Sequence, residues 1–374
     1  VGAPRHRRWT GVSARKRCLA GGARGARAAL STGAGSTELC TIRGEALPVV
    51  GDMRCDAWMP LPLLSDARAC PVPLVTRAAA THIDRDVARG DLARVDRGVY
   101  APKTLLDALA PWDRYLARVH AVALRHPDAI FVRESAAALR GIAVFGEPRD
   151  VHVVAQDAGR TRHRGSTRFH AAERMPRFER LGSFNVATAG EVAADAARLS
   201  HPAVALAVAD SALRADGTLT VADIGDLAET HPSSRGRSRA RWVCARATGT
   251  PESPLESVSI AVIEWLGFPA AESQVWIGDD RIDLFWRRWN VAGEADGDVK
   301  YSGAMGDARE ALRARRTRDG RLIARGVAAV PHWSWADAID AAPLQTALLS
   351  AGIPIVRAPQ PTFLATLPTA ARGR

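Results

Sequence analysis

The 374-residue chain lacks the features that mark several large classes of protein. No run of residues approaches the roughly 20 apolar positions that a membrane-spanning helix needs. The basic N-terminus has no apolar core of the kind found in a secretory signal peptide, because charge and glycine interrupt the stretch from Arg15 to Arg27. These absences lead us to expect a cytoplasmic protein without a membrane partner.

Motifs for metal thiolates and for phosphate loops are also missing. The cysteines, Cys18, Cys40, Cys55, Cys70 and Cys244, show neither a CxxC pair nor the cysteine/histidine spacing of a zinc site. A cytosolic setting disfavours disulfides as well, so we assign the cysteines no function. Without a GxxxxGK loop, a nucleotide-modifying enzyme of another type has little support.

What the sequence does have is an ordinary globular composition, 47% apolar and 24% charged, with a formal charge of +11. Its length suffices for two or three domains. Residues 1–58 hold ten Lys or Arg and four Asp or Glu, which gives +6 of that total. Elsewhere, arginines cluster at 160–168, 235–246 and 313–321, where they either contact phosphates or form solvated surfaces.

Residues 1–58 are rich in Arg, Ala and Gly and show no sustained periodicity, so we expect them to be disordered. A further hypothesis is that they are upstream sequence translated from a start codon placed too early. The true start would then lie near Met53 or Met59.

A short helix followed by a hairpin is predicted between residues 74 and 102. Ile83 and Val87 share a helix face that Gly90 ends, and two short β runs follow, joined at Asp96 and Arg97. This is the layout of a winged helix-turn-helix, whose second helix enters the major groove of DNA. The alternative is a small helix and hairpin with solvated arginines. The candidate DNA contacts are His82, Arg85 and Arg89 on the helix and Arg94 and Arg97 on the wing.

The middle region, 103–245, alternates helix and strand, with helices expected at 111–126 and 203–213 and a strand at 151–155. It shows no catalytic constellation. His152, His163 and His170 are scattered, and we interpret them as surface or packing residues rather than ligands.

The segment 250–345 begins with a clear helix, in which Ser253 is the N-cap, Pro254 takes the first helical position and Gly267 follows the end. Three strands are expected at 273–277, 281–286 and 290–295, then an arginine-rich helix at 304–325 and a short strand at 327–330. The order αβββαβ suits a mixed sheet flanked by helices. With a tail at 346–374, the predicted fold class is a multidomain mixed α+β (α/β) protein.

Three carboxylates are predicted to meet on this sheet. Glu294 and Asp296 project the same way from one strand, because side chains alternate along a strand. Asp283 is the acid in the neighbouring strand RIDLFW. Like charges side by side repel, and Mg²⁺, which takes one or two carboxylates and keeps several waters, would offset that repulsion and could bind a scissile phosphate.

Two stretches of the chain resemble known families. ESPLES, RIDLFW, GEADGDVKY, the arginine-rich helix and VPHWSWADAI together resemble the PD-(D/E)XK nuclease fold, in the branch close to the very-short-patch repair endonucleases. ARGDLARVDRGVYAP resembles the winged-helix domain of abortive-infection AbiEi-type antitoxins. The resemblance covers about 75–102 and 250–340, and the order and spacing of the motifs carry it.

The resemblance implies roles for individual residues. Asp283 and Glu294 would bind the metal, with the carbonyl of Ala295 as a further ligand. Glu256 matches the helix acid that often completes the site, and it equally matches the acid of a capping box with Ser253. Asp296 matches the second acid of the strand and stands where a lysine is expected, which leaves Lys300 as the candidate replacement.

One departure from the family pattern concerns the following helix. Relatives often show a glutamate and a basic residue there, where this chain has Arg315 and Arg316. With Arg313, these two are candidate DNA contacts.

We therefore predict a DNA-binding protein with a nuclease-like domain that hydrolyses phosphodiesters with Mg²⁺ or Mn²⁺, acting in defence or DNA repair. Its catalytic residues would be Glu256, Asp283, Glu294, Asp296 and Lys300. The alternative is an antitoxin-like transcriptional regulator whose nuclease fold is inactive and which binds DNA and a toxin or other protein partner. The sequence leaves the oligomeric state open.

Overall fold

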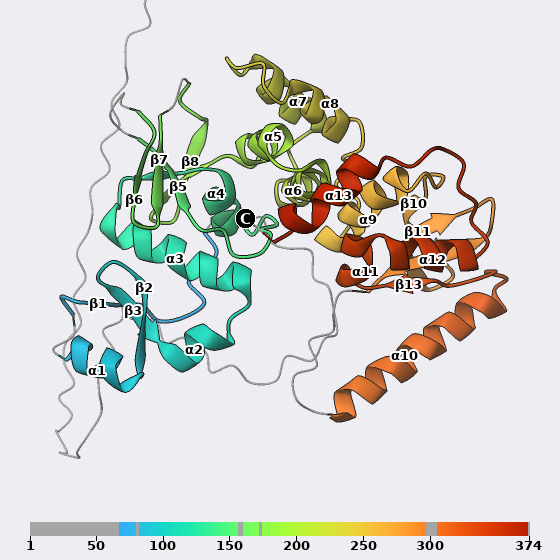
Figure 1. Cartoon of the computed structure of the whole chain (residues 1–374), viewed down its shortest axis with the longest axis horizontal. Helices are drawn as coiled ribbons and strands as arrows, with labels where there is room; N and C mark the ends of the chain where they lie inside the picture. Colours follow the sequence, from blue (N-terminus) through green and yellow to red (C-terminus); the bar gives the residue numbers. More distant parts are fainter. Residues whose placement is uncertain (1–66, 80–81, 156–159, 172–173, 297–304, 373–374) are drawn as a thin grey trace, which may run out of the picture. The chain divides into compact units, whose positions relative to one another are not determined.

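The computed structural model describes residues 67–79, 82–155, 160–171, 174–296 and 305–372 (Figure 1). Within these ranges the strands form three sheets and many helices surround them, so the predicted mixed α+β fold is confirmed. The expectations for residues 1–58 lie outside the described residues. In the described part of the chain, no helix combines the length and apolarity needed to cross a membrane.

The first sheet contains the expected hairpin. Its order is β1-β3-β2, and all pairs are antiparallel. Helix α1 (Ile83–Arg89) precedes the hairpin and ends at Gly90, whose φ of 82° is the left-handed conformation that glycine tolerates. The strands are β1 (Val75–Thr76), β2 (Leu92–Asp96) and β3 (Val99–Pro102).

Asp96 was expected in the hairpin turn but ends strand β2 instead. Its carboxylate is buried and accepts hydrogen bonds from Arg125 at 2.7 Å and from Ser166 at 2.6 Å. Burial raises the pKa of Asp96, but these hydrogen bonds lower it by more, so the pKa lies below its ordinary value. Asp96 therefore anchors the hairpin to the middle region, a role that a local reading of the sequence cannot reveal.

The second sheet has six strands in the order β6-β7-β5-β4-β9-β8 and belongs to the middle region. β4 pairs in parallel with β9 and β5 in parallel with β7, whereas the other pairs are antiparallel. Its strands are β4 (Ile130–Phe131), β5 (Val151–Val154), β6 (Arg162–Arg164), β7 (Thr167–His170), β8 (Phe178–Leu181) and β9 (Phe184–Ala187). The helices predicted at 111–126 and 203–213 are present as α3 (Pro111–Arg125) and α6 (Pro202–Ala215).

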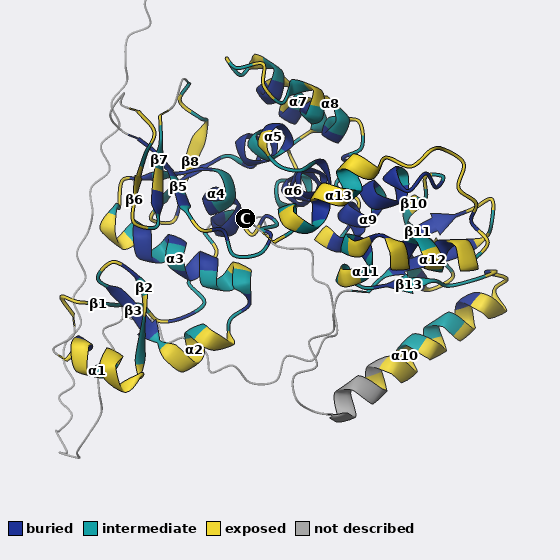
Figure 2. Cartoon of the chain, viewed as in Figure 1, coloured by how far each residue is buried: buried dark blue, intermediate teal, exposed yellow. Residues whose placement is uncertain are grey.

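Helices of the middle region pack on one another and on helix α9 (Pro254–Trp265) of the next segment. Helix α6 is buried along most of its length because its sequence is almost continuous Ala, Val and Leu (Figure 2). The middle and C-terminal segments thus share one hydrophobic core. The helices are α2 (Lys103–Ala108), α3 (Pro111–Arg125), α4 (Arg133–Arg140), α5 (Ala189–Leu199), α6 (Pro202–Ala215), α7 (Val221–Thr230) and α8 (Arg237–Cys244).

The third sheet carries the predicted αβββαβ order and the candidate site. β10, β11 and β12 are antiparallel neighbours, and β13 joins β12 in parallel. The strands are β10 (Glu272–Ile277), β11 (Asp280–Trp286), β12 (Val291–Ala295) and β13 (His332–Trp333). The remaining helices are α10 (Met305–Ala324), α11 (Trp335–Asp340), α12 (Ala342–Ser350) and α13 (Pro361–Ala370).

Both faces of this sheet are covered. Leu284 and Trp286 of β11 pack into the main core, which includes α9. Ile282 and Phe285 instead pack with Leu322 of α10 in a smaller cluster. Ile282 and Leu284, two residues apart in β11, therefore belong to different clusters.

The strand predicted at 327–330 is present only as a parallel bridge between Ala329 and Val291, and the strand β13 lies further along the chain. The chain there runs beside β12, since the Ala292 N–H donates to Ala329 O and the Glu294 N–H donates to Pro331 O, both at 3.0 Å. Pro331 has no N–H to donate, and strand β13 begins after it at His332. The sheet is mixed as expected, with its parallel strand five residues further along.

Candidate functional site

Strands β11 and β12 bring Asp283 and Glu294 together. Leu284 lies opposite Gly293 in the antiparallel register. Asp283 and Glu294 flank this pair and lie close enough for the charge of Asp283 to raise the pKa of Glu294. The Ala295 N–H donates to Asp283 Oδ2 at 2.9 Å, which fixes that carboxylate against β12. The two predicted metal ligands therefore lie on adjacent strands.

Glycine at position 293 permits this close packing. A Cβ atom there would lie 2.7 Å from the ring of Trp333 and 2.8 Å from that of Trp286. The two indoles fill the space beneath β12 and leave room only for hydrogen. The sequence VAGEA thus combines a tightly packed backbone with an acid on the next residue.

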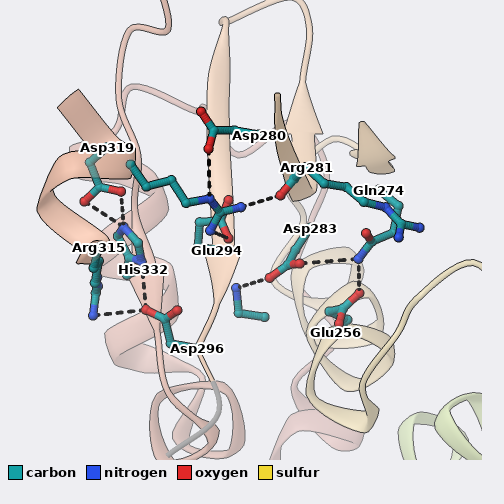
Figure 3. A network of polar contacts seen from close by, with 12 residues as sticks. Glu256, Gln274, Asp280, Arg281, Asp283, Glu294, Asp296, Arg315, Asp319 and His332 are labelled. Carbon is teal, nitrogen blue, oxygen red and sulfur yellow. Dashed lines mark hydrogen bonds and ion pairs between the residues drawn. The ribbon is translucent and has the colours of Figure 1, made fainter. Parts of the chain in front are cut away.

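Glu256 approaches Asp283 from helix α9. It closes the predicted capping box, because its Oε1 accepts from the Ser253 N–H at 2.8 Å while Ser253 Oγ accepts from the Glu256 N–H at 3.2 Å. Its Oε2 also accepts from Gln274 Nε2 at 2.6 Å, and the same nitrogen lies 3.3 Å from Asp283 Oδ1 (Figure 3). One amide therefore bridges two carboxylates, so Glu256 is both a cap and a neighbour of the site.

Two carboxyl groups of this site, those of Asp283 and Glu294, have raised pKa values. Burial and the charge of Glu256 raise the pKa of Asp283 to about 6, against the opposing effect of the Ala295 N–H. Burial and the charge of Asp283 raise the pKa of Glu294 to about 8, although Arg318 lowers it. Carboxyl groups that resist ionisation in this way are typical of functional sites, where a cation would favour the charged form.

A protein cation already contacts Glu294. Arg318 of α10 donates to Glu294 Oε2 at 2.7 Å, and the carboxylate side chain is only 3% exposed. Glu294 Oε1 is buried and has no hydrogen-bond partner among the described residues. One oxygen of Glu294 is thus satisfied by arginine, and the other is left for a further ligand.

Asp296 points toward α10, as Glu294 does, but joins a different group. Arg315 lies 3.0 Å from its Oδ2 and His332 Nδ1 lies 2.8 Å from the same atom. The other ring nitrogen of His332 lies 3.1 Å from Asp319 (Figure 3). The repulsion expected between Glu294 and Asp296 is therefore offset by two arginines of one helix.

At most two of the predicted acids, Asp283 and Glu294, could hold a metal ion together. No group of three His, Cys, Asp or Glu side chains in the described ranges is arranged to hold an ion. Asp283, Glu294 Oε1 and the Ala295 carbonyl remain as oxygen ligands on adjacent strands. This is sufficient for Mg²⁺, which needs only one or two carboxylates and completes its shell with water.

Most described arginines of helix α10 contact acids. Besides Arg315 and Arg318, Arg321 donates to Asp280 at 3.1 Å, and Arg325, which directly follows the helix, donates to the same carboxylate at 3.1 Å. The predicted DNA contacts Arg313 and Arg316 are exposed on the same helix. Lys300, the candidate catalytic lysine, lies outside the described residues.

The predicted DNA contacts of the N-terminal hairpin are all exposed: His82, Arg85, Arg89, Arg94 and Arg97. Several are engaged within the chain, however. Arg89 pairs with Asp86 at 2.8 Å and with Asp91 at 3.0 Å, and Arg94 donates to the carbonyl of Asp96 at 3.3 Å. Helix α1 contains two acids, Asp84 and Asp86, beside its two arginines, so it is not strongly basic.

Sequence reasoning missed Gln274, Asp280 and Arg318. Gln274 gives a signal only in the structure, where its φ of 57° departs from the strand conformation and its amide reaches both acids. Asp280 lies at the start of β11, where it is 5% exposed and contacts several arginines. Arg318 belongs to the arginine cluster at 313–321. Its partners lie on other elements, so they could not be identified from the sequence of one helix.

No family model, no curated protein and no solved structure matches the chain.

Proposed function

We propose that this protein binds DNA and cleaves its phosphodiester bonds by metal-dependent hydrolysis at the site formed by Asp283 and Glu294. The observation that carries the proposal is a pair of carboxylates on adjacent strands, Asp283 half-buried and Glu294 buried, of which Glu294 keeps an oxygen without a partner among the described residues. The resemblance to PD-(D/E)XK nucleases supports the same assignment. A DNA substrate also agrees with the cytoplasmic location expected from the sequence.

In this proposal Asp283, Glu294 Oε1 and the Ala295 carbonyl hold Mg²⁺ or Mn²⁺. The bound metal would lower the pKa of a water and stabilise charge on the phosphate. Gln274 orients Asp283 through its amide, and Glu256 accepts from the same amide. The exposed Arg313 and Arg316 provide charge for the DNA backbone.

A second function, DNA-binding regulation by an inactive nuclease fold of the antitoxin type, is favoured by a different observation. Arg318 and Gln274 already supply donors to Glu294, Asp283 and Glu256 without a metal. The arginine at position 315, where related enzymes often have glutamate, pairs with Asp296. A protein that needs no cation at these acids could use the fold for binding alone.

Nicking of supercoiled plasmid by the full chain distinguishes the two functions. The assay compares wild type, Asp283→Asn and Asp279→Asn with Mg²⁺, Mn²⁺ or EDTA. Asp279 is the matched control because it belongs to the same hairpin and its side chain is 99% exposed. Metal-dependent nicking that is lost in Asp283→Asn and retained in Asp279→Asn is expected.

If the wild-type chain never nicks DNA but binds it in EDTA, hydrolysis is refuted and the regulator is supported. Binding is measured by fluorescence anisotropy across a salt series. Replacing Arg97 by Ala is expected to weaken binding to all DNA sequences. It should also reduce the slope of log affinity against log salt concentration by about one. Arg288, which is exposed and stacked over Trp289, serves as the control, and Arg288→Ala should change neither the affinity nor this slope.

A further inference from the structure

A cavity of about 600 Å³ lies in the middle region, where helices α4, α5 and α6 meet strand β5. Phe145, Val192 and Val204 contribute to an apolar wall. This volume is within the range typical of sites for small organic ligands, which are mostly apolar with a few placed polar groups. The charged residues of the cavity indicate what such a ligand must carry.

Arg133 is the first of these groups. It begins helix α4 with a φ of 52°, a strained conformation for a residue with a Cβ atom. Its guanidinium makes no hydrogen bond or ion pair with any residue that the structure describes. Strain retained at a residue lining a cavity is typical of functional positions.

Arg149 and Arg168 also line the cavity but differ in their partners. Arg168 lies 2.9 Å from Asp150, which also contacts His163. Arg149 is exposed and, in the described part of the chain, has no side-chain partner. Two arginines, Arg133 and Arg149, are therefore available to an anionic group.

The cavity also contains an acid whose carboxyl makes no hydrogen bond within the described ranges. Burial raises the pKa of Asp195 of α5 to about 6, although the nearby charge of Arg133 lowers it. Glu134 lies nearby, with Oε2 3.4 Å from His152 Nε2 and no hydrogen bond to it. His152 is fixed by its contact with His170 at 2.8 Å. The acids require a ligand that donates hydrogen bonds.

We propose that this cavity binds a nucleoside monophosphate, with its phosphate on Arg133 and Arg149 and an N–H group of its base on Asp195. A simple anion would bond the arginines but leave Asp195 unsatisfied, and an uncharged apolar molecule would leave both arginines unpaired. A nucleotide combines an anionic group, a flat body for the wall of Phe145 and Val204, and base N–H donors. The cavity is separate from the carboxylate site, so this inference goes beyond the proposed nuclease.

Isothermal titration calorimetry of the full chain with AMP, GMP, CMP and UMP tests the proposal, with inorganic phosphate as the comparison. Arg133→Gly removes the cation while keeping the fold, because glycine adopts positive φ without strain. This variant is expected to weaken the best nucleotide by about tenfold or more, the usual effect of losing a charge-assisted bond. Asp195→Asn should weaken the nucleotides but leave phosphate binding unchanged.

Arg288→Ala is the control and should bind like wild type. The proposal is overturned if no nucleotide binds the wild-type chain, or if inorganic phosphate binds as tightly as every nucleotide. It is also overturned if Arg133→Gly and Arg288→Ala bind equally well. A thermal unfolding scan of each variant without ligand establishes that losses in affinity are not losses of fold.

Discussion

The ion pair between Glu294 and Arg318 is expected to stabilise the sheet to an extent that depends strongly on pH. Glu294 is 3% exposed and Arg318 30% exposed, so water screens the pair weakly. Removing one partner of a buried pair typically costs about 3–5 kcal/mol, and partial exposure of the arginine places this pair lower, at about 2–3 kcal/mol. A double-mutant cycle with Glu294→Gln and Arg318→Met measures this coupling.

The sign of the pH effect follows from the pKa of Glu294, which is raised from 4.5 to about 8. A raised carboxyl pKa means that the folded state holds its proton more tightly than the unfolded state. The stability contributed by Glu294 is therefore complete below the unfolded pKa and is lost as the pH rises through about 8. Glu294→Gln should remove this loss, and the coupling to Arg318 should be larger at pH 9 than at pH 6.

Urea unfolding at the two pH values, followed by circular dichroism, gives the free energies for the cycle. The matched control is the exposed pair of Glu272 and Arg287 on the same sheet. Their Oε1 and Nε atoms are 2.8 Å apart, and the pair should show no measurable coupling. Equal coupling at pH 6 and pH 9, or equal coupling in the two pairs, would refute the reasoning.

Three further predictions concern single residues. Ser253→Ala should destabilise the protein by about 1 kcal/mol in urea unfolding, because it removes the N-cap of α9. Gly293→Ala should cost about 1–3 kcal/mol and lower the melting temperature, since its Cβ would meet Trp286 and Trp333, and no change would contradict the packing described. Asp195→Asn should be more stable than wild type above pH 6. The pKa of Asp195 is raised from 3.8 to about 6, so the stability that the carboxyl contributes is lost as the pH rises through that range. Identical profiles of unfolding free energy against pH for the two proteins would contradict this.

Local signals in the sequence were reliable where one short segment determines the structure. The end of α1 at Gly90 and the start of α9 at Ser253 and Pro254 were both predicted, because a cap requires only neighbouring residues. The strands β10, β11 and β12 were found within one or two residues from their apolar runs. The last strand was misplaced, because pairing with β12 and the missing N–H of Pro331 decide where it begins.

The candidate site was predicted in part. The neighbourhood of Asp283 and Glu294 followed from two strands joined by a short connection. The separation of Asp296 into a group with Arg315 and His332 did not follow, because those partners come from α10 and β13.

By itself the sequence determined the elements whose stability is local: capped helices, apolar strands and the glycines that end them. It also determined that acids and arginines of the C-terminal segment would occur in sufficient number to neutralise one another. Only the tertiary structure decided which arginine contacts which acid, since α10 lies against β11 and β12 only in the folded chain. The same holds for the cavity, where Arg133, Asp195 and His152 meet because three elements pack together, and no spacing along the chain encodes that meeting.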